Sequence, residues 1–594
     1  EKTGALIMSD TATSSPLHPL TGIVTELLER HFGLIGTLRL CDSGSRNCFL
    51  IGSSGHPPYI ARLFEEAETR SGMGLQTAVL LHLNAADPEL PVPKLIKTLS
   101  GASFAEGTHE GRSVALRVTM CNAGRPYAKI TANSVVRYNL GTCLGAINRA
   151  LVSFPIGRHG NEIMWDIRKA GCSREHMSTM ADASDRMIAG QLLDFYDLEV
   201  APRLPHLHQS VLHSGVKDWN ATVIEDGSAI ANLSDFGDAI YGPRMVDLAG
   251  AMAYAMMNER SPMMAACDVL KGYHAVAPLD EDEIACLFPM IAIRLCFSLA
   301  MTAVSSANIE NTSRQLLSQE DPRGLLKQCA RIKPEVATAL FRRAIGLSAS
   351  PSFPAFNDWL SRSKGTLLPS FRMPPANYTK HVLPLDGSDP DLSFASSDTD
   401  HARAEAYWRG YMREHAFEMG IGLWHERRNI YRGEMFRSIL LDDMFRDLHL
   451  GIDIFLDALE PLYVPFSGVV VDHGYGPEPL DYGGVILLRH APEPGVEFYS
   501  LWGHLDPDSI SGWNVGDEVA AGTLFARLGD RPVNGGWLPH LHFQLSTIRY
   551  DKATEMPGVG EAPLAELWAE LYPDPAEVLL LPPETFQSAG SPKA

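Results

Sequence analysis

The stretch Pro539-His540-Leu541-His542-Phe543-Gln544-Leu545 alternates polar and apolar residues, which is the pattern of a β-strand. Residues two apart on a strand share a face, so the side chains of His540 and His542 are expected to point the same way. One imidazole can then bind a metal ion while the other handles protons.

Two motifs upstream supply further groups of the same kind. His449-Leu-Gly-Ile-Asp453 places an imidazole and a carboxylate around Gly451, where the backbone can bend tightly before an extended segment. His504 ends an aromatic-rich, strand-like stretch, residues 498–505, and reaches the same groove only if this strand neighbours that of His540. Four imidazoles and one carboxylate suffice for a zinc ion with three protein ligands and an open position. The sequence therefore predicts a hydrolytic zinc site.

The motifs stand in a supporting frame, which is Pro465-Phe-Ser-Gly-Val-Val-Val-Asp472, Tyr482-Gly-Gly-Val-Ile-Leu-Leu-Arg-His490, Val515-Gly-Asp-Glu-Val-Ala-Ala-Gly522 and Asn534-Gly-Gly-Trp-Leu-Pro539. With this frame, residues 430–560 closely resemble the lysostaphin or LytM-type zinc endopeptidases. The resemblance implies a mostly antiparallel β-sheet domain. It also implies His449, Asp453 and His542 as zinc ligands, and His504 and His540 as catalytic residues that polarise water and steady the oxyanion. The family usually cuts glycine-rich or peptidoglycan cross-bridge peptides, a substrate that nothing else in this chain supports.

A second pattern lies in the first half of the chain. Asn220 precedes Asp235-Phe-Gly by fifteen residues, across the turn Glu225-Asp-Gly-Ser228. Kinase-fold enzymes present two oxygen ligands to Mg²⁺ beside ATP in this way. Residues 17–350 resemble the aminoglycoside phosphotransferase and choline kinase superfamily, nearest to its hydroxylysine-kinase-like branch. The resemblance implies an α+β protein-kinase-like domain, with Asn220 and Asp235 as magnesium ligands and with Arg62 and Lys217 at the nucleotide.

The kinase-like pattern departs from its family at the catalytic base. Gly215 stands two residues after His213, where the family has the aspartate that takes the acceptor's proton. Arg62 replaces the usual lysine, and residues 72–76 offer no acidic partner for it. Loss of a general base costs about 10²- to 10⁴-fold in rate. We therefore expect nucleotide or Mg²⁺ binding with weak or absent phosphotransfer.

Composition and charge restrict the partners. The chain has 594 residues, 45% of them hydrophobic and 20% charged, which predicts a multidomain globular protein. Its formal net charge of −21 would repel nucleic acid and anionic lipid, so neither is an expected partner. The longest apolar run, residues 290–304, is interrupted by Arg294 and is shorter than a membrane span. The nine cysteines show no paired spacing, which favours a cytoplasmic location.

We expect five segments along the chain. Residues 1–16 are read as a disordered extension, 17–370 as the kinase-fold domain, 371–400 as a linker rich in Pro, Ser, Asp and Gly, 401–585 as the zinc peptidase-like domain, and 586–594 as a tail. Similar fusions commonly continue into a pyridoxal-phosphate-dependent class III aminotransferase. An aminotransferase domain or partner is therefore expected, and the chain could be a fragment of a longer fusion.

Three functions remain open on these grounds. The favoured one is a zinc-dependent amide or peptide hydrolase joined to a degenerate kinase-like domain for a small amino alcohol or amino acid. The second is an active ATP-dependent phosphotransferase that acts on a hydroxylated amine. The third is a noncatalytic scaffold that binds nucleotide and peptide within an aminotransferase fusion.

Overall fold

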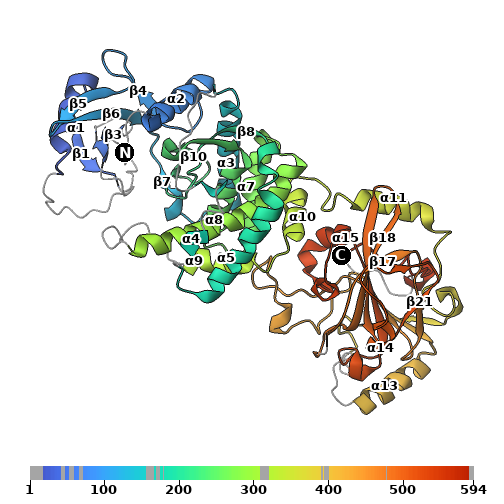
Figure 1. Cartoon of the computed structure of the whole chain (residues 1–594). Coiled ribbons are helices and arrows are strands. Elements are labelled where there is room, and N and C mark those ends of the chain that lie inside the picture. The colour runs from blue at the N-terminus through green and yellow to red at the C-terminus, as the bar shows by residue number, and fades with distance from the viewer. Residues whose placement is uncertain are drawn as a thin grey trace. The chain divides into compact units, whose positions relative to one another are not determined.

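The computed structural model describes residues 18–586, other than 42–46, 53–58, 66–70, 156–165, 169–173, 178–179, 308–319, 390–391, 393–400 and 477. The expected extension and most of the expected tail lie outside the described residues. The chain forms two compact units, Glu1–Ile345 and Gly346–Ala594 (Figure 1).

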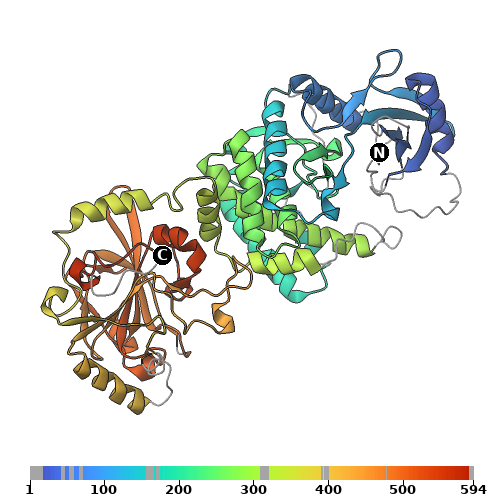
Figure 2. The same ribbon diagram turned by 180° about the vertical axis from the view of Figure 1, so that it is seen from behind.

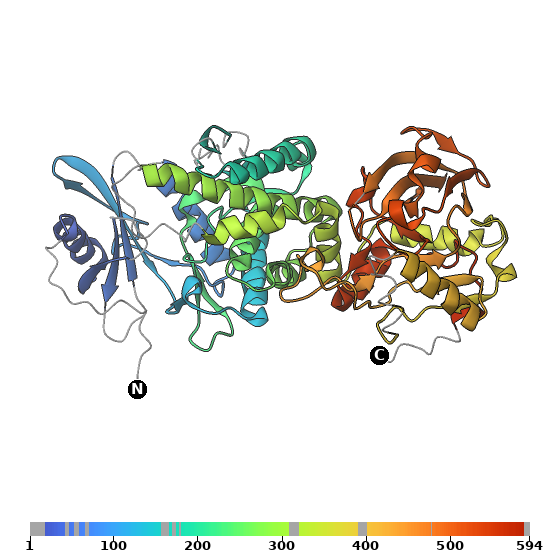
Figure 3. The same cartoon turned by 90° about the horizontal axis from the view of Figure 1, so that it is seen from below.

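The first unit begins with a six-stranded antiparallel sheet, drawn in blue in Figure 3. Its strands are β1 (Thr37–Leu40), β2 (Cys48–Gly52), β3 (Tyr59–Glu65), β4 (Lys94–Ile96), β5 (Ala105–His109) and β6 (Arg112–Met120). They run in the order β1-β2-β3-β6-β4, and β5 pairs with β6. Helix α1 (Thr21–Leu27) belongs to the same core, because Val24 and Leu27 cluster with Leu63 and Leu116 of the sheet. This burial ties the start of the described chain to the sheet.

Helices make up most of the rest of the first unit. They are α2 (Ser71–Ala86), α3 (Ser134–Leu151), α4 (Arg174–Met177), α5 (Ala183–Phe195), α6 (Met245–Met256), α7 (Pro262–Val276), α8 (Glu281–Ala307), α9 (Glu320–Cys329) and α10 (Pro334–Ala344). Glycines let α3 and α7 approach closely, since a Cβ at Gly141 or Gly272 would clash with a backbone carbonyl of the facing helix. In α8, residues Glu281–Ala300 are long and apolar enough to cross a membrane, but 89% of that stretch is buried within the protein, as in a core helix.

Two small sheets carry the kinase-like motif. One joins β7 (Arg125–Pro126), β9 (Ala221–Val223) and β10 (Ile230–Leu233), and the other pairs β8 (Gln209–Leu212) with β11 (Ile240–Pro243). The expected hairpin between Asn220 and Asp235 is therefore present as β9 and β10. The first unit has the expected kinase-like α+β fold.

The second unit is built on an eight-stranded sheet with the order β12-β13-β15-β22-β19-β18-β17-β20. The strands of the unit are β12 (Lys380–Val382), β13 (Met419–Gly422), β14 (Leu448–His449), β15 (Ile452–Phe455), β16 (Pro461–Tyr463), β17 (Gly468–Gly476), β18 (Gly483–Glu493), β19 (Val496–Leu505), β20 (Glu518–Val519), β21 (Leu524–Arg527), β22 (His540–Ser546) and β23 (Val559–Gly560). Within the large sheet only β12 and β13 pair in parallel. The predicted mostly antiparallel sheet is confirmed.

In the described part of the unit, the α-helices that accompany this sheet are α11 (Phe353–Ser363), α13 (His401–Glu414), α14 (Pro507–Ile510) and α15 (Ala565–Leu571). Figures 1 and 2 show α11 and α13 at opposite ends of the sheet. The core on one face of the sheet buries Ile454, Ile486, Trp502 and Phe543, and the residues that alternate with them along these strands point to the other face.

The structure corrects the expected boundary between the domains. Residues 346–370 belong to the second unit, because Phe356, Trp359 and Leu360 of α11 are buried in its core. The expected linker also contains structure, since β12 adds a strand to the large sheet and Leu383 is fully buried. The Pro-, Ser- and Asp-rich composition of residues 371–400 suggested a linker, but a few well-placed apolar side chains attach this segment to the sheet.

Candidate metal centre

Sheet register brings the three histidine motifs together. Strand β22 lies between β15 and β19, so that His542 pairs with Asp453 on one side and with Gly503 on the other. The short β14 ends at His449, and the turn at Gly451 leads directly into β15. The predicted turn-and-strand arrangement, and the predicted neighbouring strands of His504 and His540, are present.

Three of the predicted site residues converge on one point. Nε2 of His449 lies 3.1 Å from Nδ1 of His542 and 3.3 Å from Oδ1 of Asp453. Nδ1 of His542 lies 3.1 Å from the same carboxylate oxygen. All three residues are buried, and the three atoms form one of two clusters with metal-ligand spacing among the described residues.

The outer hydrogen bonds determine which ring nitrogens face inward. Nδ1 of His449 donates to the carbonyl of Leu423 at 2.9 Å, which leaves the lone pair on Nε2. Gln544 donates its amide N–H to the carbonyl of Pro557, so its oxygen accepts from Nε2 of His542 at 3.1 Å. Nδ1 of His542 therefore also presents a lone pair. Metal-binding histidines are usually fixed in this way.

This donor set fits a zinc ion. Two imidazole lone pairs and a carboxylate oxygen face one another, and a cation between them removes their mutual repulsion. Ligand atoms at about 2.0–2.1 Å from a tetrahedral zinc ion lie about 3.3 Å apart, close to the spacings found here. Nitrogen and oxygen ligands in this number are typical of a catalytic zinc site.

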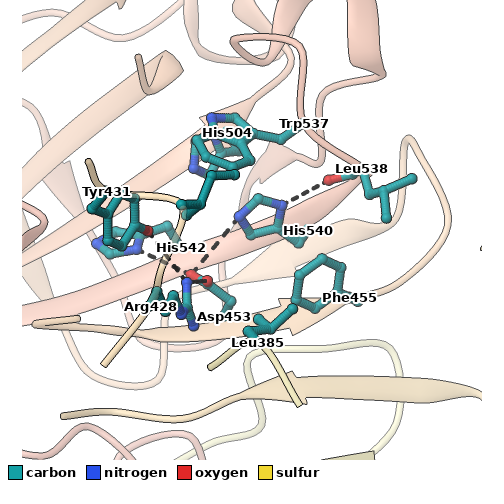
Figure 4. A pocket seen from close by; sticks show the side chains of 11 residues that line it. Leu385, Arg428, Tyr431, Asp453, Phe455, His504, Trp537, Leu538, His540 and His542 are labelled. Carbon is teal, nitrogen blue, oxygen red and sulfur yellow. Dashed lines mark hydrogen bonds and ion pairs between the residues drawn. The ribbon is translucent and has the colours of Figure 1, made fainter. Parts of the chain in front are cut away.

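His504 and His540 lie beside these three residues. Each donates through Nδ1 to a backbone carbonyl, of Asn534 at 2.9 Å and of Leu538 at 2.7 Å, so each offers an Nε2 lone pair. Their rings are 4.3 Å apart, and Nε2 of His540 is 3.8 Å from Oδ1 of Asp453. His504 has φ +60°, a left-handed conformation that concentrates at functional positions. Figure 4 shows the ring of His540 turned toward Asp453, with the ring of His504 farther from this carboxylate and near Trp537.

Burial and neighbouring charges set the protonation of the centre. Burial lowers the pKa of His449 to about 4 and lowers the pKa values of His504 and His540, so these imidazoles are neutral at pH 7. Burial alone would raise the pKa of Asp453, but the cation of Arg428 beside it holds this pKa well below its usual range. Neutral imidazoles and an ionised carboxylate are the forms that bind metal.

Arg428 is a component of the centre that the sequence analysis missed. Its Nη1 donates to Oδ2 of Asp453 at 2.6 Å, and its Nε donates to Glu426 at 2.9 Å. The guanidinium is fully buried and leaves Oδ1 of Asp453 for the ligand cluster. Arg428 lies in the stretch Trp424-His-Glu-Arg-Arg-Asn-Ile-Tyr431, just ahead of the first histidine motif. No spacing within it points to a contact with a residue 25 positions later.

A pocket opens onto this centre. Apolar and aromatic side chains form much of its wall, namely Leu385, Ile430, Tyr431, Phe455, Trp537 and Leu538 (Figure 4). Asp453, His504, His540 and His542 lie in the same lining. Three of the four predicted histidines are therefore exposed to a ligand in one pocket.

The kinase-like site of the first unit is assembled differently. Nη1 of Arg62, predicted to bind nucleotide, lies 3.4 Å from Oδ1 of Asp235, predicted to be a magnesium ligand. Asn220 donates to the carbonyl of Gly215 at 2.6 Å and accepts from the N–H of Ser234 at 2.8 Å, beside Asp235. Lys217 also lies in this loop, and its charge acts on Asp238. The predicted residues of this site therefore lie around the loop of residues 215–220.

Residues 72–76, which offer no acidic partner for Arg62, contain the amide side chain of Gln76. Gln76 of α2 donates to the carbonyl of Gly237 at 3.4 Å and accepts from Arg117 at 3.2 Å. Near Gly215, however, the structure shows a carboxylate that the sequence analysis missed. Oδ2 of Asp238 lies 3.3 Å from the position that a Cβ at residue 215 would occupy. The turn that returns Asp238 to Gly215 is not visible in the sequence Asp235-Phe-Gly-Asp238.

Comparison with known proteins identifies both regions. Residues 447–555 match the model described as peptidase family M23, and residues 37–280 match that of the phosphotransferase enzyme family. The chain joins a phosphotransferase-family domain to an M23 domain. Both matches agree with the resemblances found in the motifs.

Curated proteins named hydroxylysine kinase are similar to part of this chain. Hydroxylysine kinase of Bos taurus is 23% identical over 256 residues, covering 41% of this chain and 68% of the relative. The Mus musculus protein of the same name is 26% identical over 255 residues, with the same two coverages. Among solved structures, an aminoglycoside phosphotransferase from Alicyclobacillus acidocaldarius is 15% identical, with a TM-score of 0.41 over 57% of this chain and 98% of that chain.

Proposed function

We propose that the second unit is a zinc-dependent hydrolase of amide or peptide bonds. His449, Asp453 and His542 are its zinc ligands in this proposal, and His504 and His540 are its catalytic residues. The observation that carries it is the convergence of two imidazole lone pairs and one carboxylate oxygen within 3.3 Å of one another, in a pocket with two further neutral imidazoles.

Each group has a defined task in this reaction. When bound, zinc polarises the scissile carbonyl and lowers the pKa of water toward neutrality. A neutral Nε2 of His504 or His540 accepts the proton of the attacking water and returns it to the leaving amine. The N–H donated to the carbonyl of Asn534 or Leu538 keeps each ring oriented during both transfers. The charge of Arg428 maintains Asp453 as a carboxylate throughout.

The pocket limits the class of substrate. Its aromatic and aliphatic wall excludes water around the reacting groups, which strengthens their electrostatic interactions. We propose an intracellular peptide or small amide as substrate, because the scattered cysteines favour a cytoplasmic location. An aminotransferase, as a fused domain or as a partner, remains part of this proposal.

Hydrolysis of a panel of short peptides and small amides by the zinc-loaded chain tests the proposal. The variants His504→Ala and His540→Ala should retain zinc but lose about 10²- to 10⁴-fold in rate. His449→Ala should lose both zinc and activity. His473→Ala, in β17 and outside the pocket, is the control. Full activity of His504→Ala and His540→Ala together would refute the assigned roles.

A second candidate is phosphotransfer by the first unit. The family match, the contact between Arg62 and Asp235, and the carboxylate of Asp238 beside Gly215 favour it. Asp238 would then accept the proton of the acceptor hydroxyl in place of the absent aspartate. The hydroxylysine kinase relatives suggest a hydroxylated amino acid or amine as acceptor.

ATP consumption with 5-hydroxylysine and with ethanolamine tests this candidate. Asp238→Asn should abolish turnover, and Gly215→Asp added to Asp238→Asn should restore it, because the new carboxylate fills the same space. If Asp238→Asn has no effect, Asp238 is not the base. Binding at both sites of the chain without turnover at either would favour the noncatalytic scaffold.

A further inference from the structure

Two cysteines face each other at the end of the antiparallel pair β1 and β2. Cys41 follows the last residue of β1 and lies opposite Cys48, the first residue of β2. The N–H of Cys41 donates to the carbonyl of Cys48 at 2.9 Å, and the two sulfur atoms are 3.0 Å apart. Opposite Cα atoms joined by such a bond lie about 5.5 Å apart, within the roughly 4.4–6.8 Å that a disulfide spans. The backbone therefore holds the two thiols where a bond between them can form.

The strand register continues from Cys48 to two arginines. Cys48 pairs with Arg62 of β3, and Arg62 pairs with Arg117 of β6. Residues directly opposite each other in antiparallel strands share a face of the sheet. Phe49, the next residue of β2, is buried on the other face, in the core shared with α1. The two thiols and the two guanidinium groups therefore follow one row across the sheet.

The charge of this row favours reaction at Cys48. Arg117 is buried and donates to two uncharged side chains, those of Gln76 at 3.2 Å and Thr77 at 3.4 Å. Neighbouring cations stabilise the thiolate form of a cysteine, which is the form that attacks an oxidant. Both thiols are partly exposed, so a small oxidant can reach them. Cys48, next to Arg62, is therefore expected to react first, with the second thiol placed to complete the bond.

We propose that Cys41 and Cys48 form a reversible disulfide when the chain meets hydrogen peroxide, which makes this pair a redox-sensitive modification site. The thiolate of Cys48 attacks the O–O bond, a sulfur–oxygen bond forms, and the hydroxide that leaves takes up the proton released by Cys48 to become water. The thiol of Cys41 then displaces the hydroxyl group of this sulfenic acid, which gives the S–S bond and a second water. The two thiols lose two electrons, and the peroxide gains them.

The position of the pair connects this modification to the kinase-like site. Cys48 is the cross-strand neighbour of Arg62, which contacts Asp235 at 3.4 Å, so oxidation takes place beside these two residues. In a reducing cytoplasm such a disulfide is transient, and disulfides of this kind usually sense or catalyse redox change. The inference goes beyond both proposed activities, because it requires neither zinc binding nor phosphotransfer.

Peptide mapping of the full chain after treatment with equimolar hydrogen peroxide tests the proposal. Once the remaining thiols are blocked, trypsin cleaves after Arg46, so the disulfide should join peptide 40–46 to peptide 47–62 in the mass spectrum. The link should disappear on reduction with dithiothreitol. It should form faster in the folded chain than in urea, because the fold aligns the sulfur atoms. Burial raises the pKa of the Cys143 and Cys267 thiols to about 12, so these internal controls should stay reduced.

Variants assign the two thiols their roles. Cys41→Ser should accumulate a sulfenic acid on Cys48 that dimedone traps, because no thiol lies opposite to resolve it. Cys48→Ser should leave Cys41 largely unmodified under the same treatment. In the Cys41→Ser chain, Arg62→Met should slow trapping at Cys48 by about 3-fold or more, since it removes the adjacent cation. Arg112→Met, at the exposed start of β6, is the matched control and should leave this rate unchanged.

Three results would overturn the inference. They are the absence of the linked peptide pair from the oxidised native chain, a preferred link of either cysteine to a third one, and a rate in the folded chain no higher than in urea. If a cysteine variant does not fold, the peptide map of the native chain decides. Equal trapping rates in Arg62→Met and Arg112→Met would exclude Arg62 as the group that activates Cys48.

Discussion

At the scale of single residues, the centre depends on Arg428 as well as on the predicted ligands. Its guanidinium contacts two buried carboxylates, those of Asp453 and Glu426. Replacing it with an apolar side chain leaves both without a counter-ion, whereas an ion bound to Asp453 restores part of the compensation. The effect of the substitution should therefore depend on zinc.

We predict that Arg428→Met destabilises the second unit by about 3–5 kcal/mol in the presence of a chelator, and by less in the presence of zinc. Thermal or denaturant unfolding under the two conditions measures the difference. Arg437→Met removes an exposed arginine of the same unit and should change little. An equal loss with and without zinc would show that Arg428 does not act through Asp453.

His490 gives a pH dependence that is independent of the metal centre. It is buried, donates to the carbonyl of Ser467, and accepts from the hydroxyl of Ser500. Burial lowers the pKa of His490 to about 4, against about 6.5 in the unfolded chain. Between these values only the unfolded state binds the proton, so stability falls as the pH is lowered, by about 1.4 kcal/mol per pH unit.

We predict that His490→Gln reduces the slope of stability against pH by this amount between pH 6.5 and pH 4. Above pH 7 the free energies of unfolding of the native chain and the variant should differ by a constant amount. Denaturant unfolding across this range measures both features. If the free energies of unfolding of the two proteins run parallel over the whole pH range, His490 has the same pKa in the folded state as in the unfolded chain.

The residues that could be predicted from the sequence are those whose spacing is local. His540 and His542 share a strand, and His449 and Asp453 share a turn, so their geometry follows from backbone periodicity. Gln544 shares the strand face of His542, but its effect on the tautomer of that ring depends on its hydrogen bond to the carbonyl of Pro557, and Arg428 and Asp238 are placed by tertiary contacts. Neither this hydrogen bond nor these contacts have a signal in the sequence.

At the scale of elements, the turn between β14 and β15 requires Gly451. A Cβ there would lie 2.7 Å from Cε1 of His542 and 2.7 Å from the carbonyl of Phe543. Any larger residue must displace the ring that completes the ligand cluster. The sequence suggested a glycine that permits bending, and the structure adds that it makes room for His542.

We predict that Gly451→Ala lowers zinc affinity by at least about 10-fold, similar to the loss of an interaction that orients a ligand. Competition with a chelator of known affinity provides the measurement. Gly474→Ala in β17 is the control, because its nearest contact to a Cβ would be 3.8 Å. Unchanged affinity in Gly451→Ala would place the ion away from His542.

At the scale of the whole chain, the structure changes where the molecule can be divided. Helix α11 was assigned to the kinase-like domain because composition shifts only after residue 370. Three of its side chains, Phe356, Trp359 and Leu360, complete the core of the second unit. A change in composition suggested a linker after residue 370, but the buried side chains of α11 assign this helix to the second unit.

We predict that a fragment of residues 346–594 folds and unfolds cooperatively, whereas residues 371–594 do not. Burial of each large apolar side chain contributes about 1.5–3 kcal/mol. Loss of three such side chains approaches the total stability of an ordinary domain, about 5–15 kcal/mol. Calorimetry of the two fragments checks this. If the two fragments are equally stable, α11 is not part of the second unit and the domain boundary lies at residue 370.

The zinc content of the purified full-length chain tests the central claim most directly. After removal of loosely bound metal, we predict about one zinc ion per chain, absent in His449→Ala and in His542→Ala but retained in His473→Ala. A native chain that binds no zinc at micromolar free concentration, or zinc that persists in both ligand variants, would contradict the account.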